Sequence, residues 1–147
     1  MKRIAVAVDR SAPSLRAVDL AAEVAGKYGA ELVLLTVMRD ISGPDPALVE
    51  YARLEHIKDP PVGLSIESVR EGLTDIRNLA RNKGASKVSV EVFVGDPATE
   101  ILAYAEAGKP DLIVMGSRGH GRLAGLLLGS VVQKVAGLAP CPVLVVH

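Results

Sequence analysis

The sequence has few aromatic residues, a single cysteine and no net charge. Aromatic residues make up 3% and apolar residues 49% of the chain, so aliphatic side chains must build the core, which favours buried parallel strands covered by helices. The one cysteine, Cys141, excludes an internal disulfide and a cysteine metal cluster, and it suits a reducing cytoplasm. Because 17 basic residues balance 17 acidic ones, no overall positive field attracts a polyanion. We therefore expect neither nucleic acid nor a membrane as a partner.

Long hydrophobic runs are absent as well. No run approaches the ~20 apolar residues of a membrane span. The apolar stretch at residues 4–8 is shorter than the ~7 to 15 residues of a signal-peptide core. We therefore expect a soluble, cytoplasmic protein whose 147 residues form a single domain, residues 1–147.

Five segments of the chain have the pattern of β-strands. Continuous apolar runs, typical of strands buried on both faces, occupy residues 3–9, 31–37, 111–116 and 142–147. Residues 87–95 instead alternate valines with polar or larger side chains, which predicts a half-exposed strand at an edge of the sheet.

Helical patterns separate the strands. Apolar residues recur at three- and four-residue spacing, and the predicted helices cover residues 11–28, 64–83, 97–107 and 130–138. Gly29 and Gly84 end the first two helices, and Asp96 caps the third. The alternation of strand and helix predicts an α/β fold with a doubly wound, five-stranded parallel sheet of order 3-2-1-4-5 and helices on both faces. Residues 39–63 interrupt this alternation as a variable, proline-rich excursion with a short helical stretch at residues 47–56.

In such a sheet a ligand binds where the strand order reverses, beyond the carboxyl ends of the strands that diverge there. The loop after the first strand begins with Asp9, and the loop after the fourth strand covers residues 116–122. We expect these two loops to face each other. Asp9 has a simpler alternative role as the polar end of a strand and the cap of the next helix.

The second loop has a glycine pattern suited to phosphate. GxxG at residues 116–119 is followed by nine residues and then by Gly129 and Ser130 at the start of the last helix. Glycines let backbone amides approach a phosphate, and a helix start offers unpaired N–H groups. Arg118, His120 and Arg122 are further candidates for phosphate contacts, although a solvated loop would carry similar residues. The residues alone predict an anion at the switch point.

The whole pattern resembles the ATP-binding branch of the universal stress protein family. The resemblance rests on GxxGx9G(S/T) between a DLIVMG strand and a final PCPVLVV strand, and on the first strand ending in Asp9 with Ser11 beyond it. Thr36 stands where the family often has His, which departs from the pattern beside the expected adenine.

This resemblance implies ATP, with Mg²⁺, as the ligand and assigns roles to individual residues. Ala7 and Asp9 would meet the adenosine, Val37 would back the adenine, and Met115 would lie beneath the ribose. The ribose and phosphates would be wrapped by Gly116, Ser117, Arg118, Gly119, His120, Gly121 and Arg122. The phosphate chain would meet Gly129, Ser130, Val131 and Val132. No metal ligands are assigned, because the histidines share no metal-binding spacing.

The last strand suggests a dimer. An apolar strand at a sheet edge exposes unpaired backbone groups, and pairing of Val143–Val146 with the same strand of a second copy would cover them. The resemblance implies the same homodimer. A protected edge in a monomer is the alternative.

Three functional hypotheses remain open at this point. The first is a stress-response regulatory protein that acts as a nucleotide-dependent switch, because an anion site is predicted without an evident catalytic set. The second is an enzyme, at most a slow ATPase, since only Asp9 and the polar groups of the loop could orient water or Mg²⁺. The third is a nucleotide-free, dimeric interaction module whose glycines serve only the geometry of the loop.

Overall fold

The structure is a computed structural model that describes residues 1–39, 65–120 and 127–147. The predicted helical stretch at residues 47–56, and the candidate residues Gly121 and Arg122, lie outside the described residues. The order of elements is β1 (Arg3–Ala7), α1 (Ala12–Tyr28), β2 (Glu31–Met38), α3 (Ile66–Gly72), α4 (Thr74–Asn82), β3 (Lys87–Val94), α5 (Pro97–Gly108), β4 (Leu112–Gly116), α6 (Ser130–Leu138) and β5 (Val143–Val146).

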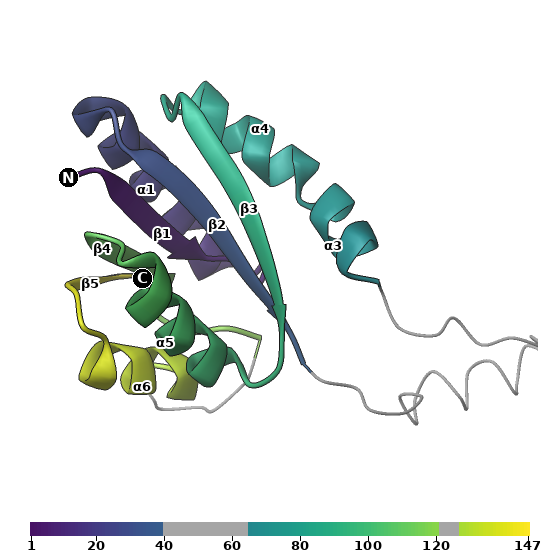
Figure 1. The fold of residues 1–147 in the computed structure, drawn as a ribbon, viewed down its shortest axis with the longest axis vertical. Helices are drawn as coiled ribbons and strands as arrows, with labels where there is room; N and C mark the ends of the chain where they lie inside the picture. Colours follow the sequence, from purple (N-terminus) through teal and green to yellow (C-terminus); the bar gives the residue numbers. More distant parts are fainter. Residues whose placement is uncertain (40–64, 121–126) are drawn as a thin grey trace, which may run out of the picture.

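The strands form one parallel sheet with the order β3-β2-β1-β4-β5 (Figure 1). The predicted strand order is thereby confirmed, and β3 is the predicted edge strand. From β1 the chain steps outward to β2 and β3, then returns across β1 to β4 and β5. The switch point therefore lies between β1 and β4.

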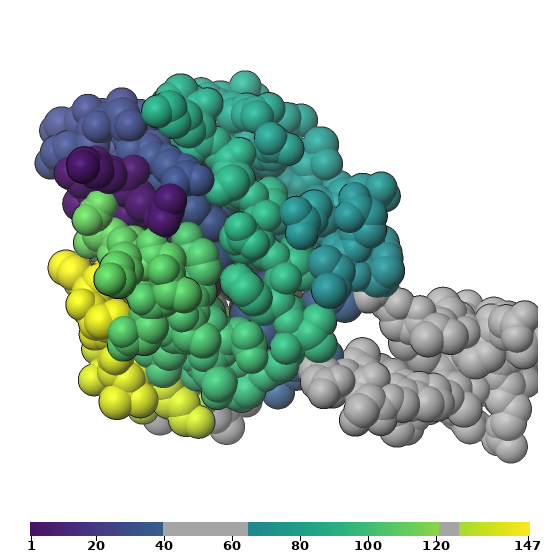
Figure 2. Space-filling model, in the orientation of Figure 1, coloured from purple at the N-terminus to yellow at the C-terminus, as the bar shows by residue number. Residues whose placement is uncertain are grey.

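Helices cover both faces of the sheet, as predicted. Ile4 and Val6 pack with the alanines of α1 on one face, and Ala5 packs with α5 and α6 on the other, because successive strand residues point to opposite sides. Figure 1 shows α1 behind the sheet and α5 in front of it. The C-terminal α6 and β5 (yellow) and the helices α3 and α4 (teal) lie at opposite sides of the space-filling view (Figure 2).

The predicted helix over residues 64–83 is wrong in one respect, because it is two helices that break at Leu73. The Leu73 side chain is buried, whereas α3 buries none of its residues. Groups outside α3 satisfy its last carbonyls: the Thr74 hydroxyl donates to Glu71, and the Arg10 guanidinium donates to Gly72. Leu73, Ile76 and Ala80 keep one apolar stripe across the break, so the spacing of apolar residues does not reveal it.

The burial predicted for the final strand is also wrong for the single chain. β5 pairs with β4 and stands at the end of the sheet, so its residues are half-buried and Leu144 is exposed. A continuous apolar run therefore marks an edge here, not a central strand.

Among the described helices, none is long and apolar enough to cross a membrane.

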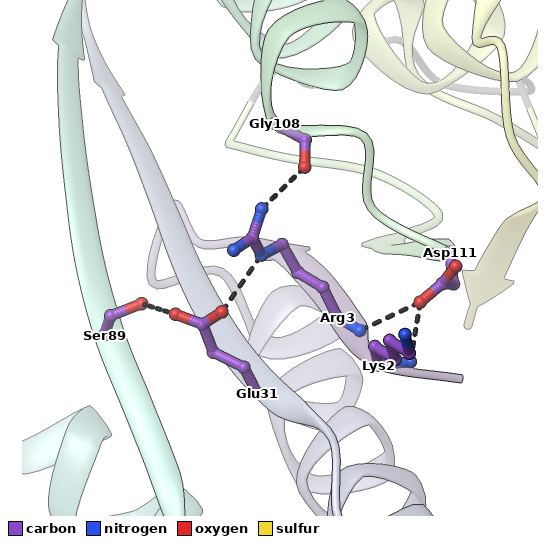
Figure 3. A network of polar contacts seen from close by, with 6 residues as sticks. All are labelled: Lys2, Arg3, Glu31, Ser89, Gly108 and Asp111. Carbon is purple, nitrogen blue, oxygen red and sulfur yellow. Dashed lines mark hydrogen bonds and ion pairs between the residues drawn. The ribbon is translucent and has the colours of Figure 1, made fainter.

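A polar network ties together the edge of the sheet where the strands begin, which we call the amino edge (Figure 3). The Arg3 guanidinium lies 3.0 Å from a Glu31 carboxylate oxygen and donates at 2.7 Å to the carbonyl of Gly108 at the end of α5. The backbone N–H groups of Lys2 and Arg3 donate to the Asp111 carboxylate at 2.6 and 2.9 Å. The Ser89 hydroxyl completes the network by donating to Glu31.

Candidate functional site

A crevice of about 320 Å³ opens at the opposite edge, the carboxyl edge, where β1, β2 and β4 end. This volume is at the lower end of the usual range for small-molecule sites. The lining residues are Ala7, Val8, Asp9, Ser14, Leu35, Val37, Arg39, Pro97, Ile101, Met115, Gly116, Arg118, Gly119, His120, Leu128, Gly129, Ser130, Val131 and Val132. The crevice thus sits at the switch point, between the loops that follow β1 and β4.

Most of the predicted site residues line this crevice. Those that do are Ala7, Asp9, Val37, Met115, Gly116, Arg118, Gly119, His120, Gly129, Ser130, Val131 and Val132. Ser117 does not line it: its side chain is buried, its N–H donates to the carbonyl of Val146, and its carbonyl accepts from the N–H of Gly129. Ser117 therefore holds β5 and the start of α6 in place from behind the crevice.

The turn after β1 places Asp9 at the crevice. The Asp9 carboxylate accepts hydrogen bonds from the N–H and the hydroxyl of Ser11. Ser11 in turn caps α1, because its hydroxyl accepts from the N–H of Ser14. The alternative role of Asp9 as the helix cap is therefore filled by Ser11, and Asp9 borders the cavity.

The glycines of the second loop have different roles. A Cβ atom on Gly116 would lie 2.7 Å from backbone atoms of Pro13 and Ser14, so Gly116 permits the close approach of β4 to the start of α1. A Cβ atom on Gly119 would lie 2.5 Å from a carboxylate oxygen of Asp9, so Gly119 leaves room for that side chain. Gly116 therefore has a packing role in addition to its place among the residues that line the crevice.

Three helices begin at the crevice, and their amino ends differ. Side chains cap two of them: Ser11 caps α1, and Asp96 caps α5 by accepting from the N–H of Thr99 at 3.0 Å. Gly129 precedes α6 and supplies no side-chain hydrogen bond. The first N–H groups of a helix have no partner within the helix, and they attract an anion. At α6 these groups belong to residues that line the cavity.

Two arginines, a histidine and one carboxylate surround the opening. Arg39, Arg118 and His120 line the crevice, and Asp9 contributes the only carboxylate among the lining residues that the structure describes. Nε2 of His120 lies 2.5 Å from the backbone carbonyl of Asp9 and, because a carbonyl only accepts, this nitrogen carries the proton. His120 thus joins the two loops.

In the described ranges (residues 1–39, 65–120 and 127–147), no cluster of three His, Cys, Asp or Glu residues could hold a metal ion.

Sequence reasoning missed part of the lining. The missed residues are Val8, Ser14, Leu35, Arg39, Pro97, Ile101 and Leu128. Leu35 could have been found, because it precedes Val37 by two residues on β2 and so faces the same side of the sheet. Pro97 and Ile101 carry no such signal, because they reach the crevice only through the packing of α5 against β2.

The fold and the crevice define a doubly wound α/β protein with a crevice at its switch point. The model of the universal stress protein family matches residues 1–147. The chain therefore belongs to the universal stress protein family.

Individual relatives agree with this assignment. Universal stress protein YxiE of Bacillus subtilis is 38% identical over 149 residues, which cover 99% of this chain and 98% of that protein. The solved structure of universal stress protein UspA from Lactobacillus plantarum is 26% identical, with a TM-score of 0.78 over 99% of this chain and 97% of that chain. A universal stress protein solved in complex with cAMP is 31% identical, with a TM-score of 0.73 and the same coverage of both chains.

Proposed function

We propose that the protein binds an adenine nucleotide, ATP with Mg²⁺, in the crevice and acts as a nucleotide-dependent regulatory switch in a stress response. The observation that carries this proposal is the amino end of α6. Of the three helices that begin at the crevice, it alone lacks a side-chain cap, so the bound anion would supply the missing acceptor.

The composition of the crevice supports a ligand with an apolar part and an anionic part. Leu35, Val37, Ile101 and Met115 provide an apolar wall, which suits a flat base. Arg118 and Ser130 border the same cavity and suit phosphates. The complex of a 31% identical family member with cAMP supports the class of ligand. ATP, as distinct from other adenine nucleotides, comes from the resemblance of the glycine pattern.

Calorimetric titration with ATP and Mg²⁺ tests the proposal, with cAMP titrated in parallel. Gly119→Val would displace the Asp9 carboxylate, and Gly129→Val would place a bulky side chain at the start of α6, so both should weaken binding at least tenfold. Gly137→Val is the matched control, because a Cβ atom at this position of α6 has no neighbour within 4 Å. Absence of binding by the wild type to either nucleotide would sink the proposal and favour the nucleotide-free interaction module.

We expect turnover of ATP to be slow. The Asp9 carboxylate is engaged by Ser11, and no second carboxylate stands beside it among the described lining residues. Release of ADP at ~1 to 100 per second, a rate typical of kinases, would contradict this expectation.

A homodimer through β5 is part of the proposal. The carbonyl of Pro142 accepts from the N–H of Ile113 in β4, and that of Val146 accepts from the N–H of Ser117 just beyond β4. The alternating residues Val143 and Val145 therefore direct their backbone groups outward. Val145→Pro would remove one outward N–H donor without removing a bond to β4. We expect sedimentation to give a dimer for the wild type and a monomer for this variant; a wild-type monomer would refute the dimer.

A cytoplasmic location also belongs to the proposal, and fractionation of cells tests it.

A further inference from the structure

Arg10 adopts a backbone conformation that disfavours its own side chain. Its φ of 64° lies in the left-handed region, which only Arg10 and Lys109 occupy among the non-glycine residues that the structure describes. Such a conformation persists only where the surroundings hold it, and it often occurs at functional sites. Arg10 lies between Asp9, which lines the crevice, and Ser11, which caps α1.

The break between α3 and α4 holds the Arg10 side chain. The Arg10 guanidinium donates to the carbonyl of Gly72, the last residue of α3. It also lies 3.2 Å from the carboxylate of Asp75 in the first turn of α4. The hydrogen bond that the Asp75 carboxylate accepts from Arg10 is the main reason that the pKa of Asp75 falls below its usual range. One cation thus satisfies a carbonyl at the end of one helix and a carboxylate at the start of the next.

The turn at Arg10 also fixes the direction of Asp9. The left-handed residue bends the chain so that the N–H of Ser11 donates to the Asp9 carboxylate at 2.9 Å. The other oxygen of this carboxylate faces Gly119 across the crevice, where a Cβ atom would lie 2.5 Å away. Any change in the conformation of Arg10 would therefore move a carboxylate that borders the cavity.

We propose that Arg10 is a positioning residue of the crevice: its contacts with Gly72 and Asp75 hold the left-handed turn that aims the Asp9 carboxylate at the bound nucleotide. Arg10 itself is not among the residues that line the cavity. The inference rests on the proposed nucleotide binding. Because coupling between two sites is reciprocal, a nucleotide that fixes Asp9 also strengthens the contact between Arg10 and the α3–α4 break.

Two substitutions at Arg10 separate positioning from direct contact. Arg10→Ala removes the guanidinium and leaves a side chain that disfavours positive φ, so we expect the affinity for ATP to fall at least tenfold. Arg10→Gly also removes the guanidinium, but glycine adopts this φ freely, so the affinity should stay within about threefold of the wild type. Equal losses in the two variants would mean that the affinity does not depend on the left-handed backbone conformation at position 10, and no loss in either would mean that the turn is irrelevant; both results overturn the proposal.

Lys109 provides a matched control at the other edge of the sheet. It has a φ of 45° at the end of α5 and lies away from the crevice. Lys109→Gly should be more stable than Lys109→Ala, as at position 10, because only glycine adopts a positive φ freely. The affinity for ATP should stay at the wild-type value in both Lys109 variants. A loss of affinity in Lys109→Ala as large as that in Arg10→Ala would show that global destabilisation causes both, which overturns the proposal.

Hydrogen exchange distinguishes failure of this inference from failure of the proposed function. Without nucleotide, amides of α3 should exchange faster in both Arg10 variants than in the wild type, and unchanged exchange would overturn the role of the Gly72 and Asp75 contacts whatever the protein binds. With ATP, exchange in α3 should slow in the wild type only. A wild type that binds no nucleotide, despite faster exchange in the Arg10 variants, would refute the proposed function and the positioning role but leave the contact itself established.

Discussion

The two edges of the sheet use polar groups in opposite ways. At the amino edge, Arg3, Glu31 and Asp111 form hydrogen bonds with one another or with nearby backbone groups, although the same residues also border a second, open hollow. At the carboxyl edge, the amino end of α6 has no side-chain cap and borders the crevice together with the side chains of Arg39 and Arg118.

Chain direction explains this difference. In a parallel α/β sheet the helices that follow the strands begin at the carboxyl edge and end near the amino edge. The amino edge therefore collects carbonyl ends of helices, which attract cations such as Arg3 at Gly108. The carboxyl edge collects N–H ends, which attract anions. The protein engages the polar side chains of the first edge in internal hydrogen bonds and leaves the amino end of α6, at the second edge, without a side-chain cap.

The largest expected effect comes from closing the gap between β4 and α1. Gly116→Ala should lower the free energy of unfolding by about 2 to 3 kcal/mol, because its Cβ atom would meet backbone atoms that cannot move aside easily. Gly137→Ala in α6 should instead raise it by about 0.5 to 1 kcal/mol, since alanine favours a helix and the site is open. Urea unfolding measures both, and equal stabilities would contradict the distinction.

Removing Arg3 from the amino edge should lower the free energy of unfolding by less than Gly116→Ala does. Arg3→Ala removes the hydrogen bond to Gly108 and the ion pair with Glu31. Because the side chains of this pair are 44% and 35% exposed, we expect the free energy of unfolding to fall by only about 1 kcal/mol. The affinity for ATP should not change, since Arg3 lies at the edge away from the crevice. A loss of affinity in this variant would show that the edges are coupled.

Removing a cation from the carboxyl edge should affect binding and not folding. Arg39→Ala should weaken ATP binding about three- to tenfold, as expected for loss of one exposed contact to an anion, and make the affinity less sensitive to salt. Lys87→Ala, which removes a cation from the amino edge, is the control. Equal affinities for the two variants in calorimetry would exclude a role for Arg39.

The smallest effect is a pH dependence at the amino edge. Hydrogen bonds from the backbone of Arg3 and Lys2 hold the pKa of Asp111 below its usual range. Since the folded-state pKa is the lower one, the stabilisation is complete above the unfolded value of about 3.9 and is lost as the pH falls through the folded-state value. Asp111→Asn should thus destabilise the protein at pH 7, and the difference from the wild type should shrink toward pH 3. A constant difference across this range would assign the effect to packing.

Much of the fold was predictable because it depends on local patterns. Apolar runs and helical spacing placed the strands and most helices, and Gly29 ends α1 in the left-handed conformation typical of a helix end. The break at Leu73 was not predictable in this way, because one of the groups that satisfy the carbonyls there, the Arg10 guanidinium, lies far away in the sequence. The buried position of Ser117 was not predictable either, because its hydrogen-bond partners lie on β5 and at the start of α6.

The sequence by itself determined the class of fold, the position of the switch point and the glycine loop beside it, because periodicity and chain direction depend on near neighbours. Only the tertiary structure decided which glycine serves packing and which serves the crevice, and that Arg39, Pro97 and Ile101 border it. It also decided that Arg10 takes a left-handed conformation against the α3–α4 break. These features depend on distances between segments far apart in the chain, which sheet order and helix packing set.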